Sequence, residues 1–381
     1  MNSTSSPSGH AALPPARAAA ADPRIDDLRI VSMSPVPPPT EVIEDLPTPS
    51  AVAHTVSAGR AALSDILAGR DDRLAVVIGP CSIHDPKAAL EYAHRLAAVR
   101  QRLAGELEIV MRVYFEKPRT TVGWKGVIND PRLDGSFRIS EGLHAARGVL
   151  LAVGETGLPA GCEFLDVITP QYLADLVSWG AIGARTTESQ IHRELASGLS
   201  MPVGFKNSTE GDVQIAVDAV RAASQPHHFL TVGKDGRSAI ARTEGNPDTH
   251  VVLRGGRQPN FDAASVGAAC GLMAAAKISQ RVMIDASHAN SGKVADNQPG
   301  VVDDIAGQLE AGDRRIFGVM VESNLMSGRQ DLVDGKALVY GRSITDACID
   351  WETSVWVLER LARAVEARRA LAKGRRGNVT A

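Results

Sequence analysis

Short apolar runs alternate with amphipathic stretches along most of the chain, and this rhythm predicts parallel strands separated by helices. The apolar runs occupy residues 74–78, 108–113, 161–165, 181–184, 203–205, 251–253, 282–284 and 319–321. Eight such units favour a closed (β/α)8 barrel, a TIM barrel of the α/β class, over an open doubly wound sheet.

Helical spacing of apolar residues separates most of these runs. In residues 86–103, for example, Leu90, Ala93 and Leu96 recur on one face of a helix. The other predicted helices cover residues 51–68, 141–153, 171–178, 188–196, 212–222, 262–277, 301–310 and 351–370. The first of these is expected to stop at Gly69, which suits a helix end.

One segment breaks the rhythm just before the sixth predicted barrel strand. Two short runs at 229–231 and 238–241 are joined through Lys234-Asp235-Gly236. An Asp-Gly turn between two such runs predicts a β-hairpin, here inserted within residues 226–249. The sequence leaves open whether this hairpin serves regulation and assembly or is a surface decoration.

Composition sets the boundaries of the remaining parts. Residues 1–23 are rich in Ser, Ala and Pro and are predicted to be a disordered tail. Residues 24–70 are predicted to form an extended, proline-containing arm and a helix that pack on a neighbouring subunit or regulate the protein. The barrel is expected over residues 71–372, and residues 373–381 form a second tail whose basic start suits a helix end.

Bulk properties exclude several classes of protein. A length of 381 residues, with 44% hydrophobic and 22% charged residues, is typical of a globular protein. No apolar run reaches the roughly 18 residues of a membrane span, and the N-terminus lacks a secretory pattern. The net charge of -3 argues against nucleic acid as the main partner. The cysteines are too scattered for a disulfide framework, which predicts a reducing cytoplasm; they are Cys81, Cys162, Cys270 and Cys348.

Polar and charged residues follow all eight predicted strands. In a parallel barrel these strand ends share one rim, and that rim carries the active site. Six of the residues are cations, namely Arg112, Lys117, Arg119, Arg185, Lys206 and Arg254. Any one of them could be an ordinary surface charge or ion-pair partner. Together they predict a site for small substrates that carry several phosphate or carboxylate groups, because unpaired cations on one rim repel one another.

A second set on the same rim offers metal ligands. Cys81, His288, Glu322 and Asp346 provide the thiolate, imidazole and carboxylates that a divalent transition metal prefers. They are far apart in sequence, so only the barrel would unite them. The alternatives are a small buried cysteine, a hydrogen-bonded loop histidine and two structural carboxylates. Cys162 and Cys270 lie within apolar segments and are interpreted as structural.

Seven sequence blocks resemble a known family. The first four are Gly79-Pro80-Cys81-Ser82, Lys117-Pro118-Arg119-Thr120-Thr121-Val122-Gly123-Trp124-Lys125-Gly126, Gly183-Ala184-Arg185-Thr186-Thr187-Glu188-Ser189 and Gly204-Phe205-Lys206-Asn207. The others are Leu253-Arg254-Gly255-Gly256, Asp285-Ala286-Ser287-His288-Ala289-Asn290 and Ser343-Ile344-Thr345-Asp346-Ala347-Cys348. From about residue 26 to 366, the chain closely resembles the type I 3-deoxy-D-arabino-heptulosonate 7-phosphate (DAHP) synthases, among the class I aldolase-like barrels.

The resemblance implies a reaction and a site. The family condenses phosphoenolpyruvate with erythrose 4-phosphate and water, in the first step of the shikimate pathway. By motif, Cys81, His288, Glu322 and Asp346 would bind a divalent metal, expected to be Mn²⁺, with Co²⁺, Fe²⁺ or Zn²⁺ as alternatives. Phosphoenolpyruvate would be held by Arg112 and Lys206 at its carboxylate and by Ala184, Arg185, Lys206 and Arg254 at its phosphate. Arg119 and Thr120 would bind the erythrose 4-phosphate phosphate, Lys117 would lie between the substrates, and Glu163 would position water.

The resemblance also implies regulation and assembly. Feedback-regulated members carry an N-terminal arm and the inserted hairpin, and bind an aromatic amino acid there. By resemblance the effector pocket would contain Pro170, Leu195, Leu199, Ser200, Phe229 and Thr231. Relatives inhibited by phenylalanine or tryptophan tend to carry Ser at the position of Thr231, and relatives inhibited by tyrosine tend to carry Gly. Thr231 therefore weakly disfavours tyrosine as the inhibitor. The arm suggests a homodimer or tetramer.

Two alternative functions remain at this point. One is a related enzyme that condenses phosphoenolpyruvate with a pentose phosphate, although the Lys117-Pro118-Arg119-Thr120 block favours the four-carbon aldehyde. The other is a non-catalytic barrel that binds an effector or partner subunit. The intact cation and ligand sets argue against this second alternative.

Overall fold

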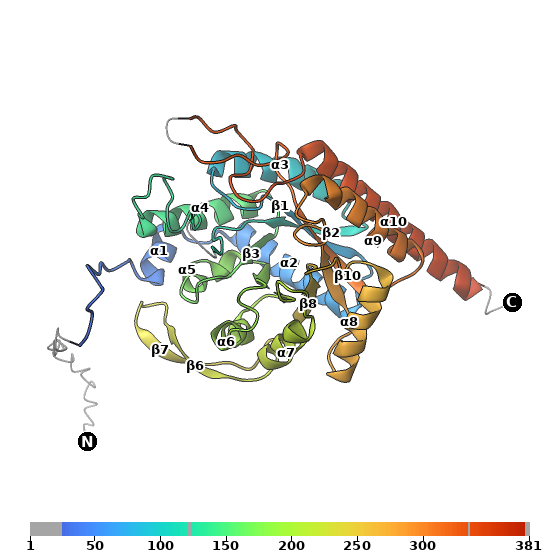
Figure 1. The fold of residues 1–381 in the computed structure, drawn as a ribbon, viewed down its shortest axis with the longest axis horizontal. Helices are drawn as coiled ribbons and strands as arrows, with labels where there is room; N and C mark the ends of the chain where they lie inside the picture. The colour runs from blue at the N-terminus through green and yellow to red at the C-terminus, as the bar shows by residue number, and fades with distance from the viewer. Residues whose placement is uncertain (1–24, 120–122, 334–335, 378–381) are drawn as a thin grey trace, which may run out of the picture. The chain divides into compact units, whose positions relative to one another are not determined.

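Eight parallel strands close into a barrel, and helices surround it (Figure 1). The structure is a computed structural model that describes residues 25–119, 123–333 and 336–377. Residues up to Val36 and residues from Pro37 onward form two separate units, and the barrel belongs to the second. In the first, Ile30 N donates to Asp27 O at 3.0 Å and closes a turn.

The strand order confirms the predicted (β/α)8 fold. Neighbouring strands pair in the order β1-β10-β9-β8-β5-β4-β3-β2, and each pair is parallel. In chain order the barrel strands are β1 (Leu74–Gly79), β2 (Leu107–Arg112), β3 (Ala160–Glu163), β4 (Trp179–Ile182), β5 (Val203–Lys206), β8 (Thr249–Leu253), β9 (Val282–Asp285) and β10 (Ile316–Glu322).

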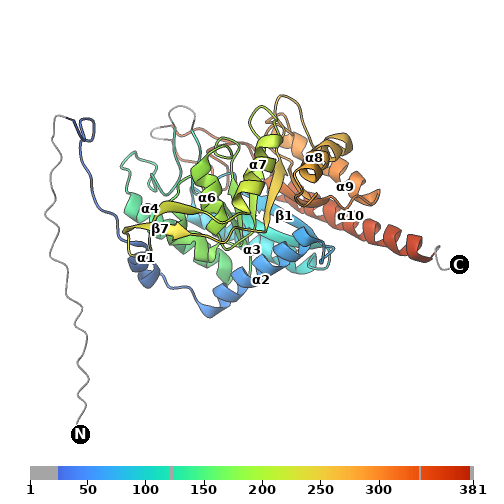
Figure 2. The same cartoon turned by 90° about the horizontal axis from the view of Figure 1, so that it is seen from below.

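The helices follow the strands in the predicted alternation. They are α1 (Pro39–Asp45), α2 (Ser50–Ala68), α3 (Pro86–Arg102), α4 (Ile139–Glu155), α5 (Pro170–Leu173), α6 (Gln190–Gly198), α7 (Gln214–Ala223), α8 (Ala263–Ala275), α9 (Gln298–Glu310) and α10 (Trp351–Gly377), with 3-10 turns η1 (Ala174–Leu176) and η2 (Ala295–Asn297). Figure 2 shows α2 along one side of the molecule, and its packing identifies that side as the closed end of the barrel.

Three local predictions differ from the structure. The predicted helix at 351–370 is too short, because α10 continues to Gly377. The predicted helix at 171–178 is wrong in extent, because α5 has four residues and continues only as the short η1. Arg60 holds the end of this segment: its guanidinium donates to Ala174 O at 2.7 Å, which also accepts from Val177 N at the end of η1, and to Val177 O at 3.0 Å. Within the predicted extended arm, residues 39–45 instead form α1, which begins at Pro39, where proline's fixed φ suits a first helical residue.

Side chains alternate between two apolar clusters along the strands. In β1, Ala75 and Val77 belong to an inner cluster, while Val76 and Ile78 join the layer beneath the helices. The inner cluster also contains Leu63, Ile66 and Leu67 of α2, so this helix plugs the amino-terminal end of the barrel. The barrel is therefore a packed core that leaves only its carboxyl end open for a site.

Trp179 dominates the inner cluster and depends on a glycine opposite. It is fully buried, and a Cβ at Gly204 would lie 2.9 Å from its ring and 2.6 Å from Val252 Cγ2. The indole Nε1 donates to His250 Nε2 at 3.2 Å, and His250 Nδ1 lies 3.2 Å from Asp248 O. His250 is thus a neutral imidazole that donates from Nδ1 and accepts at Nε2.

An antiparallel hairpin lies between α7 and β8. Its strands are β6 (His228–Val232) and β7 (Ser238–Arg242), which pair antiparallel with Leu230 opposite Ile240. Thr40 N of α1 donates to Lys234 O at 2.9 Å, and Ser197 Oγ of α6 lies 2.7 Å from Thr243 Oγ1. The hairpin therefore connects two regions of the barrel unit and lies at its periphery in Figure 1.

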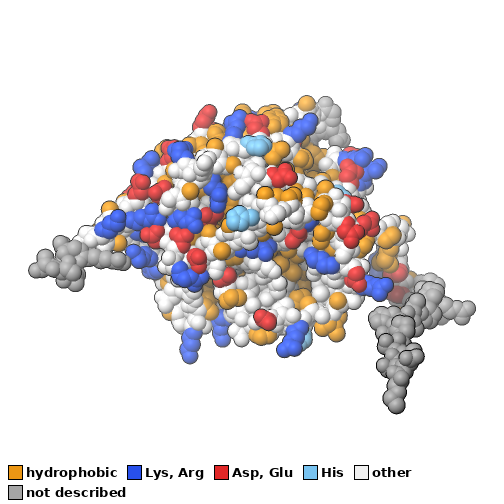
Figure 3. Space-filling view, turned by 180° about the vertical axis from the view of Figure 1, so that it is seen from behind, with side chains coloured by type: hydrophobic (Ala, Val, Ile, Leu, Met, Phe, Trp, Pro, Cys, Tyr) orange, Lys and Arg blue, Asp and Glu red, His pale blue; other side chains and the backbone are white. Residues whose placement is uncertain are grey.

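Charges of both signs are interspersed on the face shown in Figure 3, and no single basic patch covers it. This agrees with the near-neutral charge of the sequence. Within the described residues, no helix has the length and apolarity to span a membrane.

The buried His250 predicts a pH-dependent loss of stability. Burial lowers its pKa to about 4, against the hydrogen bond that Nδ1 donates to Asp248 O, which raises the pKa. The unfolded state binds this proton near pH 6.5, so the stability contribution is complete above pH 6.5 and is lost as pH falls toward 4, by about 3 kcal/mol. Denaturant unfolding across this range should show a shallower acid slope for His250→Gln than for wild type. The exposed His94→Gln is the control, and an equal slope in all three proteins would contradict the prediction.

Candidate active site

The carboxyl ends of the barrel strands bring the predicted residues into one cavity of about 880 Å³. Arg112, Glu163, Lys206 and Glu322 are the last residues of β2, β3, β5 and β10. Predicted site residues that line the cavity are Arg112, Lys117, Arg119, Glu163, Ala184, Arg185, Lys206, Arg254, His288, Glu322 and Asp346. The fold therefore unites residues that are up to 234 positions apart in sequence, from Arg112 to Asp346.

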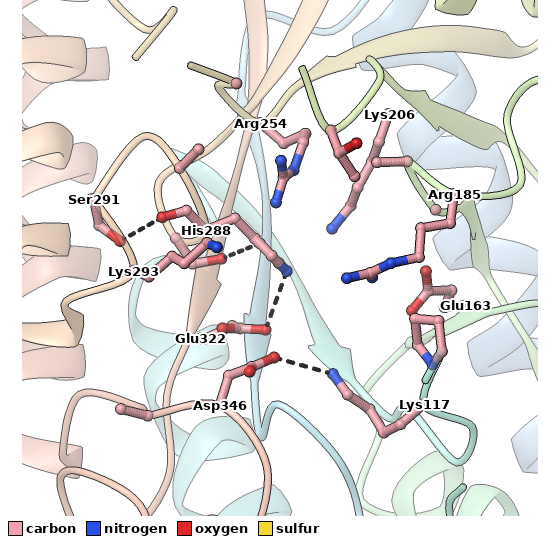
Figure 4. Close-up of a pocket in the computed structure, with 18 of the residues that line it drawn as sticks. Lys117, Glu163, Arg185, Lys206, Arg254, His288, Ser291, Lys293, Glu322 and Asp346 are labelled. Carbon is pink, nitrogen blue, oxygen red and sulfur yellow. Dashed lines mark hydrogen bonds and ion pairs between the residues drawn. The ribbon is translucent and has the colours of Figure 1, made fainter. Parts of the chain in front are cut away.

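Three cations face a common space on one side of this cavity. Figure 4 shows the ends of Arg185, Lys206 and Arg254 directed toward one another, with Glu322 and Asp346 on the other side. Arg254 is largely buried, and burial lowers its pKa, with Asp285 opposing and Arg185 adding to the decrease. Mutual repulsion of this kind is relieved by an anion in the space between the cations.

Arg112 is held rigidly beneath the cavity. Its Nε donates to Pro80 O at 3.1 Å, its Nη2 pairs with Glu322 Oε1 at 2.9 Å, and its guanidinium stacks 3.7 Å from the Tyr114 ring centroid. Burial would lower the pKa of Arg112, but Tyr114 and Glu322 outweigh it and raise the pKa. Arg112 is therefore a fixed positive charge.

Cys81 forms a compact group with two carboxylates. Donor atoms of Cys81, Glu322 and Asp346 all lie within 4.8 Å of one another. The thiol is fully buried, and burial followed by the charge of Glu322 raises its pKa to about 12. Its Sγ lies 3.3 Å from Asp346 Oδ2, and Lys117 Nζ donates to it at 3.0 Å. A cation would favour the thiolate form, so this donor set fits a divalent transition metal.

His288 points its free ring nitrogen at the same group. Its Nδ1 lies 2.8 Å from Asp285 Oδ2, and its Nε2 lies 3.8 Å from Glu322 Oε1. The backbone of His288 is left-handed, with φ of 54°. Ser287 Oγ also lies 2.8 Å from Nδ1, so a hydroxyl and a buried carboxylate together hold the proton on Nδ1 and leave the Nε2 lone pair free, as is common in metal-binding histidines. Three predicted ligands thus form the compact group, and His288 adjoins it.

Lys117 lies between the carboxylates and the cation-lined space. It is 8% exposed, and its Nζ is 3.5 Å from Asp346 Oδ2. Burial would lower its pKa, but the Cys81 thiol and the Asp346 carboxylate raise it, so the amine is protonated. Asp346, in turn, has its pKa lowered by Lys117 and His288 despite burial.

Glu163 closely approaches the turn that follows β4. A Cβ at Gly183 would lie 2.1 Å from Glu163 Oε1, so only glycine permits this approach. Thr186 N and Thr187 N each donate to Gly183 O at 3.0 Å, and this turn presents Ala184 and Arg185 to the cavity. The Gly183-Ala184-Arg185 block therefore positions both an arginine and a carboxylate.

Other predicted residues lie elsewhere. Thr120 falls outside the described residues. Arg119 is at the cavity edge, where its Nε donates to Trp124 O at 2.8 Å. The six residues predicted for the effector pocket do not line the described cavity; they lie in α5, in or just after α6, and on β6, and are Pro170, Leu195, Leu199, Ser200, Phe229 and Thr231. Their role stays a prediction.

Four charged residues at the site have no role in the sequence predictions. Glu210, Lys293 and Arg329 line the cavity, but they come from loops that no strand-end pattern marks. Asp285 ends β9, is fully buried, and contacts both Lys206 and His288. The sequence shows that Asp285 directly follows an apolar run, but only the structure shows that Lys206 and His288 both contact its carboxylate.

A parallel barrel with an anion site and a potential metal site on one rim belongs to the class of (β/α)8 enzymes that act on phosphorylated substrates. Residues 49–359 match the model of the DAHP synthetase I family, and the chain belongs to this family. The predicted family is confirmed.

Several relatives match over almost their whole length. The chain is 58% identical, over 90% of its length and 98% of the relative, to the Phe-sensitive phospho-2-dehydro-3-deoxyheptonate aldolase of Escherichia coli K12. It is 53% identical, over 91% and 99%, to the Trp-sensitive enzyme of Enterobacter agglomerans. A solved phospho-2-dehydro-3-deoxyheptonate aldolase from Francisella tularensis SCHU S4 is 52% identical, covers 89% of this chain and 99% of its own, and has a TM-score of 0.87.

Proposed function

We propose that this protein is a 3-deoxy-7-phosphoheptulonate synthase, a transferase of aromatic amino acid and chorismate biosynthesis. It condenses phosphoenolpyruvate with erythrose 4-phosphate and water to give DAHP and phosphate. The observation that carries this proposal is the cavity where Arg185, Lys206 and Arg254 face Glu322 and Asp346, whose donor atoms lie within 4.8 Å of the Cys81 thiol. Identity above 50% to relatives named for this activity supports it.

The cations divide between two substrates. Arg185, Arg254 and the Ala184 N–H bind the phosphate of phosphoenolpyruvate, Lys206 binds both its phosphate and its carboxylate, and Arg112 completes the carboxylate site. Arg112, Lys206 and Arg254 are buried, and this supports the assignment, since buried cations bind such anions strongly. Arg119, at the cavity edge, and Thr120 bind the phosphate of erythrose 4-phosphate.

The side chains also orient the chemistry. Binding both anions places the C3 carbon of phosphoenolpyruvate against the aldehyde carbon, and a C–C bond forms between them. The protonated Lys117 donates a proton to the new alkoxide. Glu163 positions the water that attacks the former enol carbon, and the phosphohemiketal then releases phosphate.

Cys81, His288, Glu322 and Asp346 would hold a divalent metal, which we propose is Mn²⁺. When bound, such an ion supplies Lewis-acid polarisation of the aldehyde. The Cys81, Glu322 and Asp346 donor atoms within 4.8 Å of one another support this ligand set. Co²⁺, Fe²⁺ and Zn²⁺ suit the same donors.

The organisation of the chain follows from the same assignment. We propose a catalytic barrel over residues 71–372, an assembly and regulatory arm and helix over 24–70, the hairpin insert at 226–249 and a tail at 1–23; the predicted tail at 373–381 begins within α10, which runs to Gly377. The exposed Leu230 and Ile240 of the hairpin support a homodimer or tetramer. All four cysteines are free thiols, which suits the cytoplasm.

A condensation assay tests the proposed activity and its metal. Phosphoenolpyruvate should be consumed with erythrose 4-phosphate but not with arabinose 5-phosphate. Chelation should reduce the rate to background and added Mn²⁺ should restore it. Turnover of the pentose phosphate instead would favour the related condensing enzyme, and no turnover with either sugar in the presence of Mn²⁺ would favour a binding protein.

Replacement of Lys117 tests the proton donor. Lys117→Met keeps the length of the side chain but removes its proton, so kcat should fall about 10²- to 10⁴-fold, the range for a general acid. Steady-state kinetics measure this, with Lys125→Met in the same segment as control. A near-normal kcat in Lys117→Met would refute the assignment.

Feedback inhibition is the regulatory part of the proposal. Relatives named Phe-sensitive and Trp-sensitive support this proposal, and Thr231 disfavours tyrosine as the effector. Millimolar phenylalanine or tryptophan should lower the rate of wild type. Phe229→Ala should raise the ratio of inhibited to uninhibited rate toward one, whereas Leu230→Ala, one residue along β6 and 81% exposed, should not. Equal rates with and without each aromatic amino acid would contradict this proposal.

A further inference from the structure

One buried carboxylate joins the proposed metal site to the proposed phosphoenolpyruvate site. Asp285 ends β9 and has no exposed surface. Its Oδ2 lies 2.9 Å from Lys206 Nζ and 2.8 Å from His288 Nδ1. Its Oδ1 accepts from Ser287 N at 3.0 Å and from Ser287 Oγ. One oxygen is therefore shared between a substrate-binding cation and a metal-binding imidazole, while the other is fixed by the backbone.

The sharing has a physical consequence for both sites. Asp285 is buried and forms an ion pair with Lys206, so its carboxylate charge is divided between Lys206 and His288. The Lys206 ammonium neutralises part of the negative charge of Asp285, which weakens the interaction of that carboxylate with the His288 imidazole. An anion that binds Lys206 and draws it away from Asp285 strengthens the interaction between Asp285 and His288, and this makes Nε2 a better metal ligand.

We propose that Asp285 is a positioning residue that couples metal binding to phosphoenolpyruvate binding through this shared oxygen. The inference rests on the proposed function. Asp285 touches neither substrate nor metal and acts through Lys206 and His288. Because coupling between two binding sites is reciprocal, metal and phosphoenolpyruvate each increase the affinity for the other.

Asp285→Asn tests this with two readouts that should move in opposite directions. The amide offers one acceptor oxygen to four donors, so the Nδ1 proton of His288 loses its anionic partner and keeps only the Ser287 hydroxyl at 2.8 Å. Affinity for Co²⁺, followed by the absorption of its bond to the Cys81 thiolate, should fall about 10- to 100-fold. Lys206 loses its competing anion, so calorimetry on metal-free enzyme should show phosphoenolpyruvate binding about threefold tighter.

Glu108→Gln is a matched control. Glu108 is 2% exposed and receives Arg73 Nη1 at 2.8 Å and Arg100 Nη2 at 2.7 Å, so it is another buried, paired carboxylate. It lies on β2 four residues before Arg112, or about 13 Å from the site rim. Its loss should reduce thermal stability and leave both affinities unchanged. A purely structural role of Asp285 would weaken both affinities together, and that result would overturn the proposal.

Lys206→Met provides an independent test in which Asp285 is intact. Without Lys206, the carboxylate of Asp285 interacts with His288 alone. The Co²⁺ affinity of Lys206→Met should therefore exceed that of wild type, and adding Lys206→Met to Asp285→Asn should raise the affinity less. Equal rises in the two backgrounds, or no rise in wild type, would overturn the coupling. Wild-type protein that binds neither Co²⁺ nor phosphoenolpyruvate would instead refute the proposed function itself, which separates the two failures.

Discussion

Closure of the parallel barrel is the constraint on which the rest of this structure depends. It carries the ends of β2, β3, β5, β9 and β10 to one rim, where charges that are far apart in sequence meet at hydrogen-bond distance. At the other end, α2 inserts Leu63, Ile66 and Leu67 among the inward-facing residues and fills the core. The interior is thereby reserved for packing and the chemistry is confined to one face.

The charges on that face are arranged so that some are neutralised by the protein and others are not. Arg112 pairs with Glu322 at 2.9 Å, and Lys206 pairs with Asp285 at 2.9 Å, both in buried surroundings. Such pairs hold their members in one geometry, because separation would leave a charge buried and uncompensated. Arg112 and Lys206 also line the cavity, together with Arg185 and Arg254, and an anionic substrate there is a natural partner for all four.

Family membership and geometry support each other without being the same argument. The family match covers residues 49–359, and most of the rim residues lie within it. The geometry adds what identity alone does not give, such as the Gly183 position that admits Glu163 and the buried carboxylate of Asp285. The structure therefore specifies which side chains contact one another within the site that the family match covers.

The sequence by itself determined the barrel and most of its rim, because strand periodicity and the residues that follow each strand are local properties. It offered Cys81, Glu322 and Asp346 as candidate ligands through their donor chemistry and through motif resemblance, and tertiary structure then placed their donor atoms together. It missed Asp285 as a shared partner, and it overextended the helix at 171–178, where Arg60 binds carbonyls from a distant helix. Contacts between segments remote in sequence leave no periodic trace, so only the folded chain decided them.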